Sequence, residues 1–267
     1  MLSFPECQTL VVREADGVLE VTLNRPARKN ALSSAMIDEL TQVFRACAGE
    51  ARAIVLRGAG QTFCAGADIK DMQQASAGQA ADKQRHIARD NRRLGEMLVA
   101  VETAACPVVA VVEGAVLGGG IGLVCTSDIV LAADSARFGL PETGLGLLAA
   151  QIAPFVVQRI GLAQARRLML TGARLDAHAA ERLGLVHSVS TDTTALDAEL
   201  QKTLTDIRRC APGANARTKR FLFSVVNRDL SAVLDLGAQL FAEASVGEEA
   251  DEGRSAFLEK RPPRWNV

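Results

Sequence analysis

The spacing of hydrophobic residues predicts short strands that alternate with helices over the first part of the chain. Apolar and polar residues alternate at Thr9–Arg13 and Val18–Leu23, on either side of Ala15-Asp16-Gly17, which predicts a hairpin. Helical spacing begins after Ser33, whose hydroxyl suits an N-cap. Further buried strands are predicted at the apolar runs Ala53–Arg57, Val108–Val112 and Asp128–Ala133. This alternation is typical of an α/β fold with much parallel pairing.

The pattern becomes purely helical from about Leu196. Four helices are expected there, at Leu196–Arg209, Ala214–Val226, Ser231–Ala244 and Glu248–Lys260. The change predicts a core over residues 1–195 and a helical region over residues 196–267. The helical region has many apolar positions, and one thin appendage cannot bury all of them. Because large exposed apolar patches mark interfaces, we expect it to mediate oligomerisation.

One polar stretch interrupts the regular pattern. Residues from about Met72 to Arg93 are rich in polar and small side chains, which predicts a mobile loop or a frayed helix. An amphipathic helix is expected to follow it and to end before Pro107.

Composition excludes several classes of function. The 267 residues are 48% hydrophobic, which predicts one large domain or one domain with an appendage. The net charge is −1, which gives no electrostatic reason to expect binding to nucleic acid or to an anionic membrane. Aromatic residues make up only 4%, which leaves few platforms for stacking bases. The six cysteines form no C-x-x-C pair, and no signal peptide precedes the first strand. A reduced cytoplasmic protein without a metal site is expected.

Two glycine-containing turns carry the candidate chemistry, Phe63 to Lys70 and Leu117 to Gly122. Each follows an apolar strand and opens a predicted helix, with Asp68 placed as an N-cap in the first. Helix starts present unpaired backbone N–H groups where the dipole favours negative charge, so two facing turns would form an oxyanion hole. A dinucleotide site is the alternative, with Asp134 on the ribose, but G-x-G-x-x-G fails because Leu123 occupies its last position.

Together with the segment from Asn24 to Leu32, which reads N-R-P-A-R-K-N-A-L, these turns resemble the crotonase (enoyl-CoA hydratase/isomerase) superfamily. The resemblance runs from about Val18 to the C-terminus. It implies a spiral of ββα repeats with a helical C-terminal appendage, assembled as a homotrimer or a dimer of trimers. It also implies an acyl-CoA substrate, with coenzyme A as part of the substrate and no separate cofactor.

The same resemblance assigns roles to residues of both turns. It implies that the backbone N–H groups of Ala67 and Gly119 bind the thioester oxygen. Many hydratases have a lysine at the position of Ala27, so Arg28 and Lys29 are expected to serve the CoA phosphates instead. The implied substrate and CoA contacts are Arg28, Lys29, Ala65, Asp68, Ile69, Lys70, Gly118 and Lys260.

The acid–base residues distinguish members of this superfamily. Two-carboxylate hydratases carry one glutamate three positions after the donor glycine, where this chain has Gly122, and another in a Pro-Glu turn, here Glu142. We therefore predict Glu142 as the single general acid/base. A lone carboxyl fits two reactions, an enoyl-CoA isomerase that shuttles one proton or a hydratase whose water is held by another group.

The residues that follow Glu142 in the sequence favour the hydratase. Leu145 to Val157 resembles the bacterial hydratases of branched, carboxylated esters, namely methylglutaconyl-CoA and isohexenylglutaconyl-CoA. The alternatives are the Δ3,Δ2-enoyl-CoA isomerase and, as a different class, a non-catalytic RNA- or protein-binding member. A glutaconyl ester brings its own carboxylate, for which a cation is expected. The candidate cations are Lys83, Arg85, His86, Arg89, Arg92 and Arg93.

Overall fold

A computed structural model describes residues 6–47, 51–69, 71, 80–226 and 229–266 of the chain. Its strands form a six-stranded sheet in the order β1-β2-β3-β4-β6-β9 and a three-stranded sheet in the order β5-β7-β8. The large sheet contains β1 (Leu10–Ala15), β2 (Val18–Leu23), β3 (Ala53–Gly58), β4 (Val108–Val112), β6 (Ile129–Ala133) and β9 (Ser188–Ser190). The small sheet contains β5 (Ala115–Leu117), β7 (Arg137–Gly139) and β8 (Arg174–Asp176).

The predicted hairpin and parallel pairing are confirmed. β1 and β2 pair antiparallel around Asp16 and Gly17, which both have positive φ, whereas β2, β3, β4, β6 and β9 run parallel to one another. The chain gives one strand to each sheet and then a helix, in the orders β4-β5-α4 and β6-β7-α5. This repeated ββα path is the spiral that the family resemblance implies.

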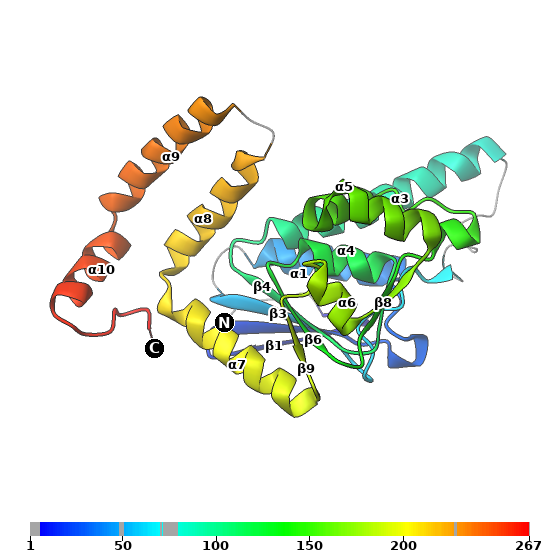
Figure 1. Ribbon diagram of the computed structural model, residues 1–267, viewed down its shortest axis with the longest axis horizontal. Coiled ribbons are helices and arrows are strands. Elements are labelled where there is room, and N and C mark those ends of the chain that lie inside the picture. The colour runs from blue at the N-terminus through cyan, green and yellow to red at the C-terminus, as the bar shows by residue number, and fades with distance from the viewer. Residues whose placement is uncertain (1–5, 48–50, 70, 72–79, 227–228, 267) are drawn as a thin grey trace.

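The strand β4 is buried on both faces of the large sheet, which explains why all five of its residues are apolar. Val108, Ala110 and Val112 belong to one hydrophobic cluster, and Val109 and Val111 belong to the other. The first cluster packs under the helices drawn above the sheet in Figure 1. These are α1 (Ser34–Ala46), α3 (Ala80–Glu102), α4 (Gly119–Thr126) and α5 (Ala153–Thr171), with the shorter α6 (Ala177–Arg182) beside them.

The helix α7 (Thr193–Arg209) covers the opposite face through Leu196, Leu200 and Leu204. The division at residues 195 and 196 stays a prediction, and it falls inside a helix that packs on the sheet. The helices that leave the core are α8 (Pro212–Val225), α9 (Leu230–Ser245) and α10 (Glu248–Leu258), which Figure 1 shows as an arm beside it. Lys219 fixes the base of the arm, since its Nζ lies 2.6 Å from Asp128 and donates to the Cys106 carbonyl.

The polar segment before Leu94 corrects one expectation. Residues 80–93 belong to the continuous helix α3, and residues 72–79 lie outside the described part of the chain. Charged pairs one turn apart support this helix in place of an apolar stripe, among them Arg85 with Asp82 and His86 with Asp90. In the described ranges, no helix combines the length and apolarity needed to cross a bilayer.

Candidate active site

The two glycine turns face one another at the edge of the large sheet, as the sequence predicts. Cys64 makes a parallel bridge with Val116, and its carbonyl accepts from the Leu117 N–H at 2.9 Å. Gly66 has φ +92°, and a Cβ there would lie 3.0 Å from the Leu117 carbonyl oxygen and 3.7 Å from the Gly118 Cα. Only glycine combines that φ with that approach, so the turns meet because residue 66 has no side chain.

Hydrogen bonding singles out two N–H groups in these turns. The N–H of Ala65 donates to Lys29, that of Asp68 to Leu32 and that of Gly118 to Gly139. By contrast, the N–H groups of Ala67 and Gly119 have no acceptor among the residues that the structure describes. They are the two donors expected from the sequence, and they are free to receive a developing oxyanion.

The helix α4 brings the second donor into place. Gly119 is its first residue, so the positive end of the helix dipole lies at this donor. A Cβ on Gly119 would lie 2.7 Å from Leu32 Cδ1, and one on Gly120 would lie 2.8 Å from the Cys64 carbonyl oxygen. The glycines therefore allow α4 to pack directly against the first turn.

Glu142 begins the 3-10 helix η2 (Glu142–Leu145), immediately after Pro141. Its Oε1 lies 2.8 Å from the point that a Gly118 Cβ would occupy, so the carboxyl group reaches the second turn. Its Oε2 is buried and has no hydrogen-bond partner within the described ranges. Burial raises the pKa of this carboxyl group above its ordinary value. A partly buried carboxyl with a raised pKa and one oxygen without a partner, close to two free N–H groups, is suited to transfer a proton.

The position of the missing second carboxylate is closed. A Cβ on Gly122 would lie 2.7 Å from Ile152 Cγ2 and 3.0 Å from Leu98 Cδ1. Leu98 comes from α3 and Ile152 directly precedes α5, and both side chains are buried. Gly122 is thus a helix-packing glycine beneath an apolar wall. The spacing of the sequence showed that Gly122 stands where many hydratases have a glutamate. It did not predict that Leu98 and Ile152 cover this position.

The segment from Asn24 to Leu32 supports the first turn from below. Arg25 forms an ion pair of 2.9 Å with Asp68, whose Oδ1 also accepts from the Asp71 N–H at 3.5 Å, as a cap would. Asn30 is fully buried, and its amide donates to the carbonyls of Ala59 and Thr62 and accepts from the Arg25 N–H. The sequence identified the segment, but the Asn30 and Arg25 contacts were missed.

The remaining predicted contacts are placed as follows. Arg28 and Lys29 are exposed next to the first turn, and Ile69 is 47% exposed there. Lys70 lies outside the described residues. Lys260 lies just after α10, the helix that Figure 1 draws on the arm, apart from α4. Within one chain, therefore, the structure does not bring Lys260 to the other candidates.

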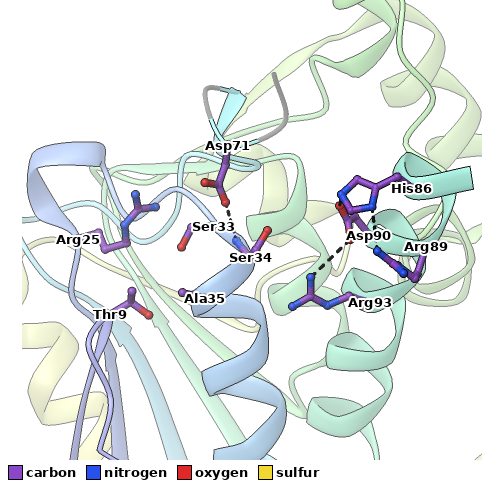
Figure 2. Close-up of a pocket in the computed structure, with 10 residues that line it drawn as sticks. All are labelled: Thr9, Arg25, Ser33, Ser34, Ala35, Asp71, His86, Arg89, Asp90 and Arg93. Atoms are coloured by element: carbon purple, nitrogen blue, oxygen red, sulfur yellow. Dashed lines mark hydrogen bonds and ion pairs between the residues drawn. The ribbon is translucent and has the colours of Figure 1, made fainter. Parts of the chain in front are cut away.

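A polar cavity of about 830 Å³ lies between the start of α1 and α3 (Figure 2). Three of the predicted cations line it, His86, Arg89 and Arg93. Arg93 is hydrogen-bonded to Asp38 and paired with Asp90, and Arg89 contacts His86 at 2.8 Å. In the part of the chain that is described, no cluster of three or more His, Cys, Asp or Glu residues could hold a metal ion.

A comparison with known families decides the assignment. The family model described as enoyl-CoA hydratase/isomerase matches residues 13–267. The chain belongs to the enoyl-CoA hydratase/isomerase family.

Individual relatives of this enoyl-CoA hydratase/isomerase family member agree along their whole length. The solved structure of Pseudomonas aeruginosa AtuE is 52% identical with a TM-score of 0.93, over 97% of this chain and 100% of that one. A probable enoyl-CoA hydratase, echA8 of Mycobacterium tuberculosis, is 35% identical over 97% of this chain and 98% of its own. The Escherichia coli 2,3-dehydroadipyl-CoA hydratase is 32% identical over 95% of this chain and 97% of its own length. The family and these names support an enzyme of the hydratase type that acts on CoA thioesters.

The Asn30 contacts generate a stability prediction for this hydratase-family site. Replacing Asn30 with Ala removes three hydrogen bonds and leaves their partly buried partners unpaired, so we expect a loss of about 3 kcal/mol in unfolding free energy. Chemical denaturation would measure it. The control is Asn24→Ala, because Asn24 is exposed in the same segment. Equal stability of the two variants would contradict the role given to Asn30.

Proposed function

We propose that this protein hydrates an α,β-unsaturated CoA thioester that is branched and carries a carboxylate, of the methylglutaconyl-CoA or isohexenylglutaconyl-CoA type. The observation that carries the reaction is the carboxyl of Glu142, whose Oε2 has no partner among the described residues, beside the two free N–H donors. The proposed chemistry uses these groups, an arginine or lysine set for the CoA phosphates, a water molecule and the ester itself.

The proposed steps follow from that geometry. The thioester oxygen accepts from the N–H groups of Ala67 and Gly119. The Glu142 carboxylate takes a proton from water while the water oxygen bonds to the β-carbon, and the electrons move to the thioester oxygen as an enolate. The enolate then collapses and takes the proton back from Glu142 at the α-carbon. Stabilising the enolate with one backbone donor typically contributes about 10²- to 10³-fold to turnover.

The choice of acyl group rests on three observations. An apolar wall replaces the second carboxylate at Gly122, so the site has fewer negative charges than a two-carboxylate hydratase. Basic residues lie along α3, the helix that also supplies Leu98 of this wall. One relative is named for 2,3-dehydroadipyl-CoA, whose acyl group also ends in a carboxylate. These features support an anionic acyl group, in line with the sequence resemblance from Leu145 to Val157.

An enoyl-CoA isomerase is the second candidate, because one carboxyl suffices to move a proton between the α- and γ-carbons. The same Glu142 and the same donors would serve it. The two functions differ in whether water enters the product.

Glu142→Gln tests the general acid/base. The amide keeps the shape of the side chain but cannot accept the proton, so turnover should fall by at least ~10²-fold while CoA-ester affinity changes much less. Wild-type turnover should also decline on acidification at a pH above the ordinary carboxyl range. The reason is that burial raises the Glu142 pKa and only the ionised form is a base. The control is Glu20→Gln on the exposed side of β2. Unchanged turnover in the Glu142 variant would assign the base elsewhere.

A substrate panel tests the proposed reaction and acyl group. It contains crotonyl, 3-enoyl, methylglutaconyl and isohexenylglutaconyl thioesters, and mass spectrometry reports whether water is added. We expect the two carboxylated esters to be hydrated much faster than crotonyl-CoA. Equal rates with crotonyl-CoA would refute the acyl assignment, and faster isomerisation of the 3-enoyl ester would favour the second candidate.

The arm supports a proposed trimer or dimer of trimers. Its exposed apolar side chains include Leu222, Val226, Leu230, Leu234 and Phe241, and the last is 76% exposed. Phe221, Leu236 and Leu240 instead pack in part within the arm. A second copy of this chain is the partner proposed for this apolar surface. Sedimentation at micromolar concentration should show a trimer or hexamer, and Phe241→Asp should shift it toward monomer. A monomeric wild-type protein would contradict the proposal.

A further inference from the structure

A notch in α3 lies beside the apolar wall of the site. Gly95 is buried, and a Cβ there would lie 2.1 Å from Gln151 Oε1 and 3.1 Å from Arg92 Nη1. The side chains of Gln151 and Arg92 therefore converge on one point of the helix, and they meet there only because residue 95 is glycine. Nothing in the sequence pattern predicted this meeting, because Gln151 and Arg92 are far apart in the chain.

The notch is close to the reacting end of the site. Leu94, which directly precedes Gly95, approaches the donor residue Gly119, since its Cδ1 lies 3.9 Å from the point of a Gly119 Cβ. Ile152, which directly follows Gln151, closes the position of the missing carboxylate at Gly122. Gly95 directly follows Leu94 in α3, so the notch lies next to the residue whose side chain approaches Gly119.

Both side chains at the notch have unused donors. Among the described residues, Gln151 makes no side-chain hydrogen bond, and the nearest acid to Arg92 is Glu96 at 4.0 Å. Arg92 and Glu96 are both more than 45% exposed, so water readily replaces their contact. Gln151 turns its oxygen to the helix, which leaves its Nε2 hydrogens available. The guanidinium N–H groups of Arg92 and the Nε2 hydrogens of Gln151 are donors on neighbouring side chains, and such donors match a carboxylate, which only accepts hydrogen bonds.

The other cations on α3 are committed or distant. Arg85 lies seven residues before Arg92, about 10 Å away along the helix. His86 and Arg89 are bonded to each other. Arg93 is bonded to Asp38 and paired with Asp90, on the side of α3 that faces α1. Lys83 lies nine residues before Arg92, about 13 Å away along the helix. Arg92 is therefore the cation placed to reach an acyl group bound at the donors.

We infer that Arg92 and Gln151, brought together by Gly95, bind the carboxylate of the acyl group and so determine specificity. This inference rests on the proposed function, because it requires an anionic acyl group. It makes Arg92 and Gln151 substrate-binding residues that select the ester, while proton transfer stays with Glu142.

The test uses two esters that differ only in the carboxylate, 3-methylglutaconyl-CoA and 3-methylcrotonyl-CoA. The measured quantity is the ratio of their kcat/KM values for hydration. Arg92→Gln and Gln151→Ala should each lower this ratio by about 10- to 100-fold, as expected for a lost hydrogen bond to a charged group, with 3-methylcrotonyl-CoA affected little. Gly95→Ala should do the same without removing either polar group, because its Cβ would displace the Gln151 amide.

Two further variants control the experiment. Arg45→Gln removes the same charge from an exposed position on α1 and should leave the ratio unchanged. Arg92→Lys keeps the charge and should restore part of the ratio. Thermal unfolding of each variant identifies any that are misfolded, and the conclusion then rests on the folded ones.

The outcomes separate this inference from the proposed function. If the wild-type enzyme prefers the carboxylated ester but the Arg92, Gln151 and Gly95 variants keep that preference, or lose both activities equally, the inference is overturned and the proposed function stands. If the wild-type enzyme has no such preference, the acyl group proposed for this enzyme is itself wrong.

Discussion

The contact between Gly66 and the main chain at Leu117 and Gly118 is the constraint on which the rest of the site depends. The neighbouring parallel strands β3 and β4 carry the chain to the same edge of the sheet, and there the two turns approach until no Cβ fits between them. Both proposed oxyanion donors are consequently main-chain atoms of packed elements. Such donors would need no rearrangement when charge develops on the substrate, which is how preorganised donors act in catalysis.

The proposed role of Glu142 as the base has a cost in stability. A partly buried carboxyl whose Oε2 has no hydrogen-bond partner among the described residues destabilises the folded state, and an arginine beside it would remove that cost. The same arginine would lower the pKa of the carboxyl group and weaken it as a base. Burial raises the pKa of Glu142, and Arg89 and Arg93 of α3 are bonded to other side chains.

The sequence predicted the parts of the site whose residues lie close together in the chain. Short motifs and their spacing predicted the facing turns, the donors and the position of Glu142. The free N–H groups of Ala67 and Gly119 agree with the predicted donors. The wall over Gly122 could not be predicted, because Leu98 and Ile152 come from separate helical segments that only the fold brings together. The sequence left residues 80–93 open between a mobile loop and a frayed helix, since charge pairs rather than an apolar stripe support that part of α3.

The wall at Gly122 also bears on the charge of the site. A glutamate at residue 122 would be forced among Leu98 and Ile152 without a partner, and its charge would raise the pKa of Glu142 further. It would also repel a carboxylate on the acyl group. Glycine avoids all three effects, because it lets α3 and Ile152 close over α4 with apolar side chains alone. An anionic acyl group requires few negative charges and available hydrogen-bond donors around it. The absence of a carboxylate at residue 122 and the presence of donors at the neighbouring notch both meet this requirement.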